Sequence, residues 1–206
     1  MALNATPLRV VKVGGSLFDP ITLPDRLRGW LDAQSSANLV LVAGGGPFVE
    51  RVRDWDRQRR LDTVAAHWLC VDVMTATARL LHAWLPEFVL VDDERDLFKP
   101  VGRPIASIFS PAAWLRLREP QTPGTKLPPT WQTTSDAIAG RLAGVLGADE
   151  LVLLKATLPP TPIAKRWDSL AAGDYVDAVL PQLAPELPPA RLVDLRSRFP
   201  REAKVG

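Results

Sequence analysis

Two glycine-rich segments follow apolar stretches near the start of the chain, and a lysine precedes the first one. The segments are Lys12-Val13-Gly14-Gly15-Ser16 and Val42-Ala43-Gly44-Gly45-Gly46-Pro47. Glycines between a strand and a helix can leave backbone N–H groups free to surround an anion at the positive end of that helix, although glycine also serves ordinary tight turns. Because two such segments occur close together, we expect a phosphate site formed by Gly14, Gly15, Ser16, Gly44, Gly45 and Gly46.

Lys12 lies between Val11 and Val13, two residues before the first glycine. A lysine near the end of a strand can point into a cleft, where its ammonium group stabilises the charge that develops during phosphoryl transfer. The alternative is a surface lysine on an edge strand, and the apolar neighbours favour the cleft. Ser16 has two open interpretations, because its hydroxyl can donate to a phosphate or cap the following turn.

Asp136 and Lys155 are further candidates for the same chemistry. Asp136 follows Thr134 and Ser135 in the first turn of an expected helix, and Lys155 ends the apolar run 151–154. The carboxylate can orient the two lysines, accept hydrogen bonds from the glycine segments or hold Mg²⁺ through water, whereas an acid also simply favours a helix N-terminus. Strand ends line the clefts of open α/β sheets, which favours a site role for Lys155 over a solvated lysine.

Other catalytic and cofactor patterns are absent from the sequence. The glycine segments lack the Gly-Lys-Ser/Thr of a P-loop and the Gly-x-Gly-x-x-Gly order of a dinucleotide-binding fold. The two histidines, His67 and His82, do not have metal-ligand spacing and no Cys/His cluster accompanies them, so we expect no zinc site. No serine lies in a nucleophile-elbow pattern. We therefore assign no residue as a metal ligand.

Length and composition indicate one soluble α/β domain. The chain has 206 residues, 47% of them hydrophobic and 23% charged, and a net charge of +2, which is ordinary for a globular protein. We expect no nucleic-acid partner because the basic residues are mixed with acidic ones. We expect no membrane segment because the sequence shows no apolar leader and no long apolar run. The single Cys70 fits a cytoplasmic protein, and we expect it to be a buried structural thiol.

Short apolar runs alternate with helical periodicity along the chain. We expect strands at 8–13, 39–43, 88–91, 104–109, 151–154 and 191–195, helices at 24–34, 47–60, 63–84, 134–146 and 175–183, and a helical turn at 110–116. All-apolar strands are typical of a parallel sheet that is covered on both faces. The pattern predicts a three-layer αβα sandwich with a mainly parallel central sheet.

On these motifs the chain resembles the amino acid kinase superfamily, which includes acetylglutamate, uridylate, aspartate and isopentenyl phosphate kinases. The matching segments are Lys12–Ser16, Val42–Gly46 and Thr134–Ala139, and the resemblance covers residues 8–157. The small size, the segment Trp68–Met74 and Trp131 look most like the aminomethyl-furanmethanol phosphate kinases of methanofuran-type cofactor biosynthesis.

The resemblance implies a single domain over 1–206, with an acceptor-binding half at 1–120 and a reduced nucleotide-binding half at 130–206. It implies ATP and Mg²⁺ as cofactors and a small phosphorylated molecule as acceptor, and we expect a homodimer. The expected catalytic residues are Lys12, Asp136 and Lys155, and the expected nucleotide contacts are Thr134, Ser135, Lys155 and Thr157.

One segment departs from the family pattern. Family kinases place Thr-Asp and then an Asp-Gly turn after this strand, whereas here the chain continues Lys155-Ala156-Thr157-Leu158-Pro159. Either Lys155 takes a phosphate-binding role, or ATP binding has been lost. We expect an ATP-dependent small-molecule kinase, and the alternative is a non-catalytic member that binds a phosphorylated metabolite or forms a subunit of a biosynthetic complex.

Overall fold

The computed structural model describes residues 6–19, 21–97, 106–160 and 166–205. In these residues the centre is a seven-stranded sheet of order β3-β4-β2-β1-β5-β6-β7. Its strands are β1 (Leu8–Val13), β2 (Asn38–Ala43), β3 (Val89–Val91), β4 (Ala106–Phe109), β5 (Glu150–Lys155), β6 (Ala190–Asp194) and β7 (Arg201–Val205). All neighbouring strands run parallel except β7, which is antiparallel to β6. The mainly parallel sheet is thereby confirmed.

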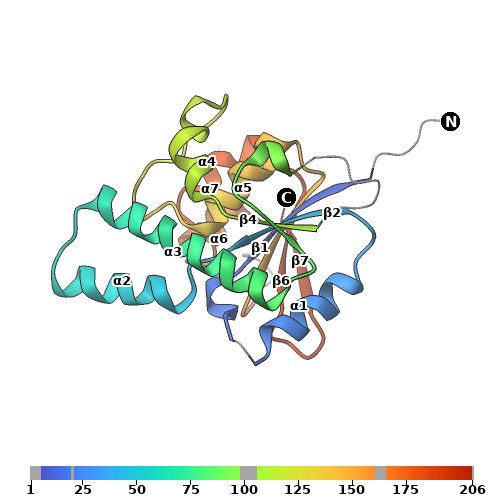
Figure 1. The fold of residues 1–206 in the computed structure, drawn as a ribbon. Helices are drawn as coiled ribbons and strands as arrows, with labels where there is room; N and C mark the ends of the chain where they lie inside the picture. The colour runs from blue at the N-terminus through green and yellow to red at the C-terminus, as the bar shows by residue number, and fades with distance from the viewer. Residues whose placement is uncertain (1–5, 20, 98–105, 161–165, 206) are drawn as a thin grey trace.

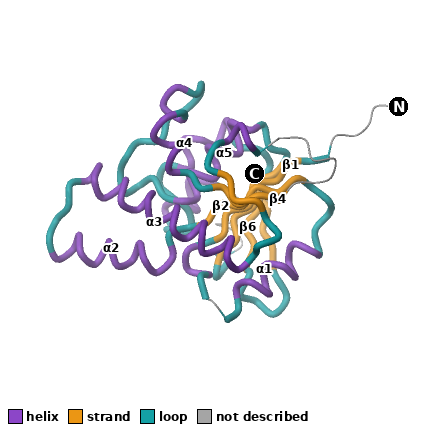
Figure 2. Tube along the Cα trace, viewed as in Figure 1, coloured by secondary structure: helices purple, strands orange, loops and turns teal. Residues whose placement is uncertain are grey.

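Helices cover both faces of the sheet, as the ribbon in Figure 1 and the tube in Figure 2 show. They are α1 (Leu23–Asp32), α2 (Gly46–Gln58), α3 (Thr63–Trp84), α4 (Ala112–Leu117), α5 (Ser135–Leu146), α6 (Trp167–Ala172) and α7 (Leu180–Leu183). One buried apolar cluster joins α4, α5, α6 and α7 to one face, and a second joins α1 and the C-terminal part of α3 to the other. This is the expected αβα sandwich.

Side-chain alternation along the central strands decides which face each lysine takes. Val10 of β1 and Leu153 of β5 belong to the cluster under α5, whereas Val11 belongs to the cluster on the α1 side. Successive side chains of a strand point to opposite faces. Lys12 therefore lies on the same face as Val10, and Lys155 lies on the same face as Leu153. Both lysines are directed to the layer that contains α5.

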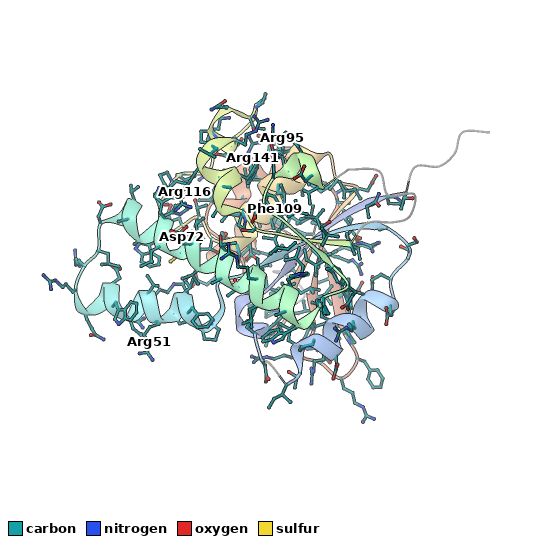
Figure 3. The ribbon with its side chains drawn as sticks, viewed as in Figure 1. Arg51, Asp72, Arg95, Phe109, Arg116 and Arg141 are labelled. Atoms are coloured by element: carbon teal, nitrogen blue, oxygen red, sulfur yellow. The ribbon has the colours of Figure 1, made fainter. Side chains whose placement is uncertain are left out.

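The helices α2 and α3 form an antiparallel pair that extends away from the sheet (Figure 1). In the described part of the chain, α3 is the one helix with the length and mean hydropathy (1.2) to cross a membrane, a test that core helices also pass. Its buried face packs like that of a core helix, through Ala66, Val71, Met74, Ala78 and Leu81 among others. Arg116 of α4 pairs with Asp72 of α3 at 2.9 Å, and Figure 3 shows the two side chains together.

The expected elements up to 146 occur with boundaries shifted by a few residues, except that 104–105 lie outside the described residues. Beyond that point the prediction was wrong in two places. Helix 175–183 is reduced to α7 and is preceded by the unexpected α6, and β7 was not expected at all. As an edge strand, β7 has no apolar run: Arg201 pairs with Asp194 at 3.1 Å and Glu202 pairs with Arg191 at 2.5 Å. Charged edge strands resist detection by hydrophobic pattern.

Candidate functional site

The C-terminal ends of β1, β2 and β5 meet at one edge of the sheet, where a pocket of about 670 Å³ opens. The chain passes from β1 to β2 on one side and later reaches β5 on the other, and ligands of open α/β sheets bind at such a switch in strand order. The volume is typical of small-molecule sites. The expected site residues that line the pocket are Lys12, Gly14, Gly15, Ser16, Gly45, Gly46, Thr134, Ser135, Lys155 and Thr157. Asp136 and Gly44 lie behind this lining.

The amide groups of Gly14 and Gly44 donate hydrogen bonds to the ends of neighbouring strands at this edge of the sheet. Gly14 N donates to Leu154 O at 3.0 Å, and Gly44 N donates to Val13 O at 2.9 Å. A Cβ on Gly44 would lie only 2.7 Å from the backbone N of Gly15. The two glycine segments therefore touch through their backbones, and these two glycines serve this close approach.

The remaining glycines leave donors at the start of α2. Apart from hydrogen bonds within a helix, the backbone N–H groups of Gly15, Gly45 and Gly46 donate to no acceptor in the described residues. Gly45 is the N-cap of α2, no side chain caps that end, and Gly46 has a positive φ of 60°. The first N–H groups of a helix have no partner within it and lie at its positive end. This part of the pocket is therefore suited to an anion.

Asp136 lies between the two lysines and contacts both. Lys12 Nζ is 2.9 Å from Oδ1, and Lys155 Nζ donates to Oδ2 at 2.5 Å. Lys12 and Asp136 are only 5% and 3% exposed. Burial alone would raise the pKa of Asp136, but the ammonium groups of Lys12 and Lys155 outweigh it and lower that pKa to about 2. Burial also lowers the pKa of Lys155. Among the roles left open by the sequence, this geometry favours orientation of the two lysines.

Asp177, a residue with no recognisable signal in the sequence, caps the helix that contains Asp136. Its Oδ2 accepts hydrogen bonds from Thr134 N at 2.9 Å and from Ala137 N at 2.7 Å, and its Oδ1 is hydrogen-bonded to the Thr134 hydroxyl. Thr134 is the N-cap residue, but its own side chain makes no capping bond. Burial, reinforced by the charge of Asp136, raises the pKa of Asp177 to about 6.

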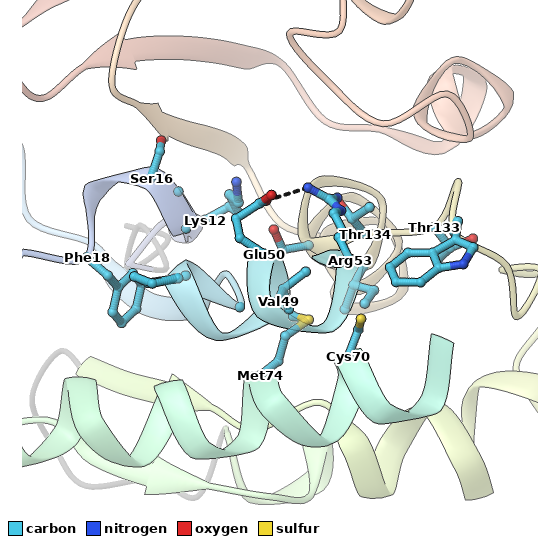
Figure 4. A pocket seen from close by; sticks show the side chains of 18 of the residues that line it. Lys12, Ser16, Phe18, Val49, Glu50, Arg53, Cys70, Met74, Thr133 and Thr134 are labelled. Atoms are coloured by element: carbon cyan, nitrogen blue, oxygen red, sulfur yellow. Dashed lines mark hydrogen bonds and ion pairs between the residues drawn. The ribbon is translucent and has the colours of Figure 1, made fainter. Parts of the chain in front are cut away.

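The facing wall of the pocket comes from α2 and α3 (Figure 4). Glu50 and Arg53 of α2 form an ion pair at 2.5 Å, and Cys70 and Met74 of α3 lie near them. Cys70 is half-buried and lines the pocket, which corrects the expectation of a buried structural thiol. Burial raises the pKa of its thiol to about 11, so it is protonated at neutral pH. The Nδ1 atom of His67 lies 3.2 Å from Thr130 O.

The chemistry of the donors fits phosphate groups better than a protein-bound magnesium ion. Both carboxylate oxygens of Asp136 contact lysine ammonium groups, and both of Asp177 are hydrogen-bonded to the start of α5. The described residues contain no group of three or more His, Cys, Asp or Glu that could hold a metal. Mg²⁺ is commonly bound by one or two carboxylates together with substrate phosphates. Within the described residues, the pocket offers cations and amides for phosphate oxygens, but no free carboxylate pair for the metal.

No protein-family model and no curated protein sequence matches the chain, whereas several solved structures do. UMP kinase from Ureaplasma parvum has a TM-score of 0.67 at 11% identity, over 98% of this chain and 100% of that one. Uridylate kinase from Archaeoglobus fulgidus has a TM-score of 0.60 at 12% identity, over 98% of this chain and 91% of that one. UMP kinase from Bacillus anthracis has a TM-score of 0.59 at 13% identity, over 94% of this chain and 88% of that one. These enzymes belong to the amino acid kinase superfamily. The chain has the amino acid kinase fold that UMP kinases adopt.

Proposed function

We propose that the protein is a small-molecule kinase that transfers a phosphoryl group from ATP to an acceptor that itself bears a phosphate. The observation that carries this proposal is the arrangement of Lys12 and Lys155 around Asp136, beside the free amide groups at the start of α2. The fold shared with UMP kinases supports the same class of reaction. By the motifs named above, the acceptor belongs to methanofuran-type one-carbon cofactor synthesis.

In this mechanism the protein positions the phosphates and stabilises charge, and it does little covalent chemistry. The acceptor occupies the side of the pocket formed by α2 and α3, and ATP lies toward Thr134, Ser135 and Thr157. Lys12 and Lys155 donate to oxygens of the transferring phosphoryl group, because charge develops there in the transition state. Asp136 stays ionised and offsets the repulsion between the two ammonium groups in the absence of phosphate. Mg²⁺ would enter with the nucleotide and would supply neutralisation of phosphate charge.

A second candidate is a non-catalytic protein that binds a phosphorylated metabolite. The segment after Lys155 favours it, because Ala156–Pro160 contains no acidic residue and no Asp-Gly turn for the nucleotide. In this case the lysines and the glycine amides would bind the ligand's phosphate without transferring it.

Calorimetric titration with ATP–Mg²⁺ separates the two candidates. We expect the wild type to bind ATP–Mg²⁺, and Lys155→Ala to bind it at least about tenfold more weakly because a charge-assisted contact in the pocket is lost. Lys204→Ala, which changes an exposed lysine of β7, should behave as the wild type. Product analysis with UMP and with aminomethyl-furanmethanol phosphate as acceptors then tests transfer, which Lys12→Ala should abolish. The kinase proposal would be contradicted if the wild type does not bind ATP–Mg²⁺ and does not transfer phosphate to either acceptor.

A further inference from the structure

The first turn of α5 is held from outside the helix. Its N-cap residue, Thr134, makes no capping bond with its own side chain. The carboxylate of Asp177, in the connection between α6 and α7, occupies that place and accepts from the backbone N–H groups of Thr134 and Ala137. Asp177 is only 9% exposed, so these bonds are shielded from water.

The two amide groups that Asp177 binds flank Asp136 in the sequence. One belongs to Thr134, two residues before Asp136, and the other to Ala137, the residue directly after it. The backbone around Asp136 is thus fixed at both sides by one carboxylate. Its side chain must then reach Lys12 of β1 at 2.9 Å and Lys155 of β5 at 2.5 Å. A shift of the first turn of α5 would move Asp136 away from both lysines.

The contacts of Asp177 can be satisfied in either charge state. Its Oδ2 accepts both amide bonds, and a proton on Oδ1 would be donated to the Thr134 hydroxyl, which donates instead when the acid is ionised. The charged groups that face it are Asp136 from α5, Lys12 from β1 and Lys155 from β5. Burial and the charge of Asp136 raise the pKa of Asp177 to about 6, against the opposing effect of Lys12. The cap therefore persists across neutral pH.

We propose that Asp177 is a positioning residue of the site: by capping α5 from the α6–α7 connection, it holds Asp136 between Lys12 and Lys155. This deepens the proposed kinase function, and its value for phosphate binding rests on that function. The positioning of Asp136 by Asp177 concerns the ligand-free protein and is independent of any reaction.

Three variants separate capping from other roles of Asp177. Asp177→Ala removes the cap, and Asp177→Glu keeps the charge but lengthens the side chain. Asp177→Asn restores the contacts without charge, because its carbonyl oxygen accepts both amide bonds and its amide group donates to Thr134 Oγ1. Asp168→Asn, an exposed acid of α6 whose side chain is 77% exposed, is the matched control.

The first readout uses the protein without ligand. We expect hydrogen exchange at the amides of Thr134 and Ala137 to accelerate at least about tenfold in Asp177→Ala or Asp177→Glu, and less than about threefold in Asp177→Asn. The titration of Asp136, followed by its carboxyl ¹³C resonance, should move up toward the ordinary range of a carboxyl in the disrupted variants and not in Asp177→Asn. A cap that stabilised the helix without positioning Asp136 would leave this titration unchanged.

The second readout is the affinity for ATP–Mg²⁺. Asp177→Ala and Asp177→Glu should bind at least about tenfold more weakly, and Asp177→Asn and Asp168→Asn should stay within about threefold of the wild type. If the wild type itself does not bind ATP–Mg²⁺, the proposed function fails. Amide hydrogen exchange and the titration of Asp136 still test whether Asp177 positions Asp136. Unchanged amide exchange and an unchanged Asp136 titration in Asp177→Glu, or in Asp177→Ala, would overturn the proposal.

Discussion

Asp136 matters to the protein before any substrate binds, because it is the counter-charge for the buried ammonium group of Lys12 and the partly buried one of Lys155. Its carboxylate contacts Lys12 and Lys155 from one position, at 2.9 and 2.5 Å. Two lysines so placed repel each other once the carboxylate is removed, whereas a bound phosphate can take its place. The stability of the free protein and its response to phosphate should therefore both depend on this residue.

We expect Asp136→Asn to lower the free energy of unfolding by about 3 kcal/mol, because removal of one partner leaves buried charge without compensation. Inorganic phosphate should then raise the melting temperature of the variant more than that of the wild type. Thermal melts with and without phosphate test this, with Asp168→Asn as control. Equal stability of variant and wild type, with equal responses to phosphate, would contradict the role of Asp136.

Asp177 gives a prediction about pH. Its pKa is raised from 3.8 to about 6, so the folded protein binds this proton more tightly than the unfolded chain. The resulting stabilisation is fully present below pH 3.8 and is lost as pH rises through 6, which amounts to on the order of 3 kcal/mol. Asp136, whose pKa is lowered, acts in the opposite direction but below pH 4. The free energy of unfolding, measured in urea at pH 4 to 7, should show this decline in the wild type and not in Asp177→Asn. Parallel plots of that free energy against pH for the two proteins would argue against it.

At the scale of elements, the two glycine segments form one structural unit in which backbones touch. A Cβ on Gly44 would meet the backbone N of Gly15 at 2.7 Å, whereas a Cβ on Gly29, within α1, would meet nothing within 4 Å. These two glycines therefore form a matched pair for substitution by alanine.

We expect Gly44→Ala to destabilise the protein by about 1–3 kcal/mol, because the added atom forces the two segments apart. It should also weaken binding of phosphate, although Gly44 does not line the pocket. Gly29→Ala should instead stabilise by about 0.5–1 kcal/mol, since alanine is the better residue inside a helix. Chemical denaturation and calorimetry measure both effects. Loss of stability in both variants alike would mean that contact between the segments is not the cause.

Much of this element arrangement is predictable from the sequence, and the exceptions have physical reasons. Lys12 and Lys155 could be predicted because one lies near the end of an apolar strand and the other ends one, and strand periodicity gives their face. Asp177 could not, because it bonds to Ala137 across 40 residues and its partners are backbone amides, which leave no mark in the sequence. The sequence also could not predict that the amides of Gly14 and Gly44 donate to the neighbouring strands, because a glycine with a free amide and one with a bonded amide have the same sequence pattern.

At the scale of the whole molecule, the proposed acceptor and nucleotide halves share one sheet, and each of the two apolar clusters that cover it contains residues of both halves. β1, from the acceptor half, pairs with β2 on one side and with β5 on the other. Arg141 of α5, which Figure 3 labels, is buried and pairs with Glu119 at 3.2 Å and with Glu186 at 3.0 Å, so it links residues from both halves. Because both apolar clusters draw residues from the two proposed halves, we expect neither half to keep its packing when the other unfolds.

We therefore expect a single cooperative unfolding transition in spite of the proposed division into an acceptor half and a nucleotide half. Tryptophans occur in both, for example Trp30 and Trp114 in the first and Trp131 and Trp167 in the second, so fluorescence reports on the entire chain. Tryptophan fluorescence and far-ultraviolet circular dichroism should give coincident thermal curves, and the calorimetric and van't Hoff enthalpies should agree. Saturating ATP–Mg²⁺ should move both curves together, because a ligand bound only to the native state stabilises the entire cooperative unit. Two separate transitions, or a shift confined to one probe, would show that the halves unfold independently and that the site lies between separate domains.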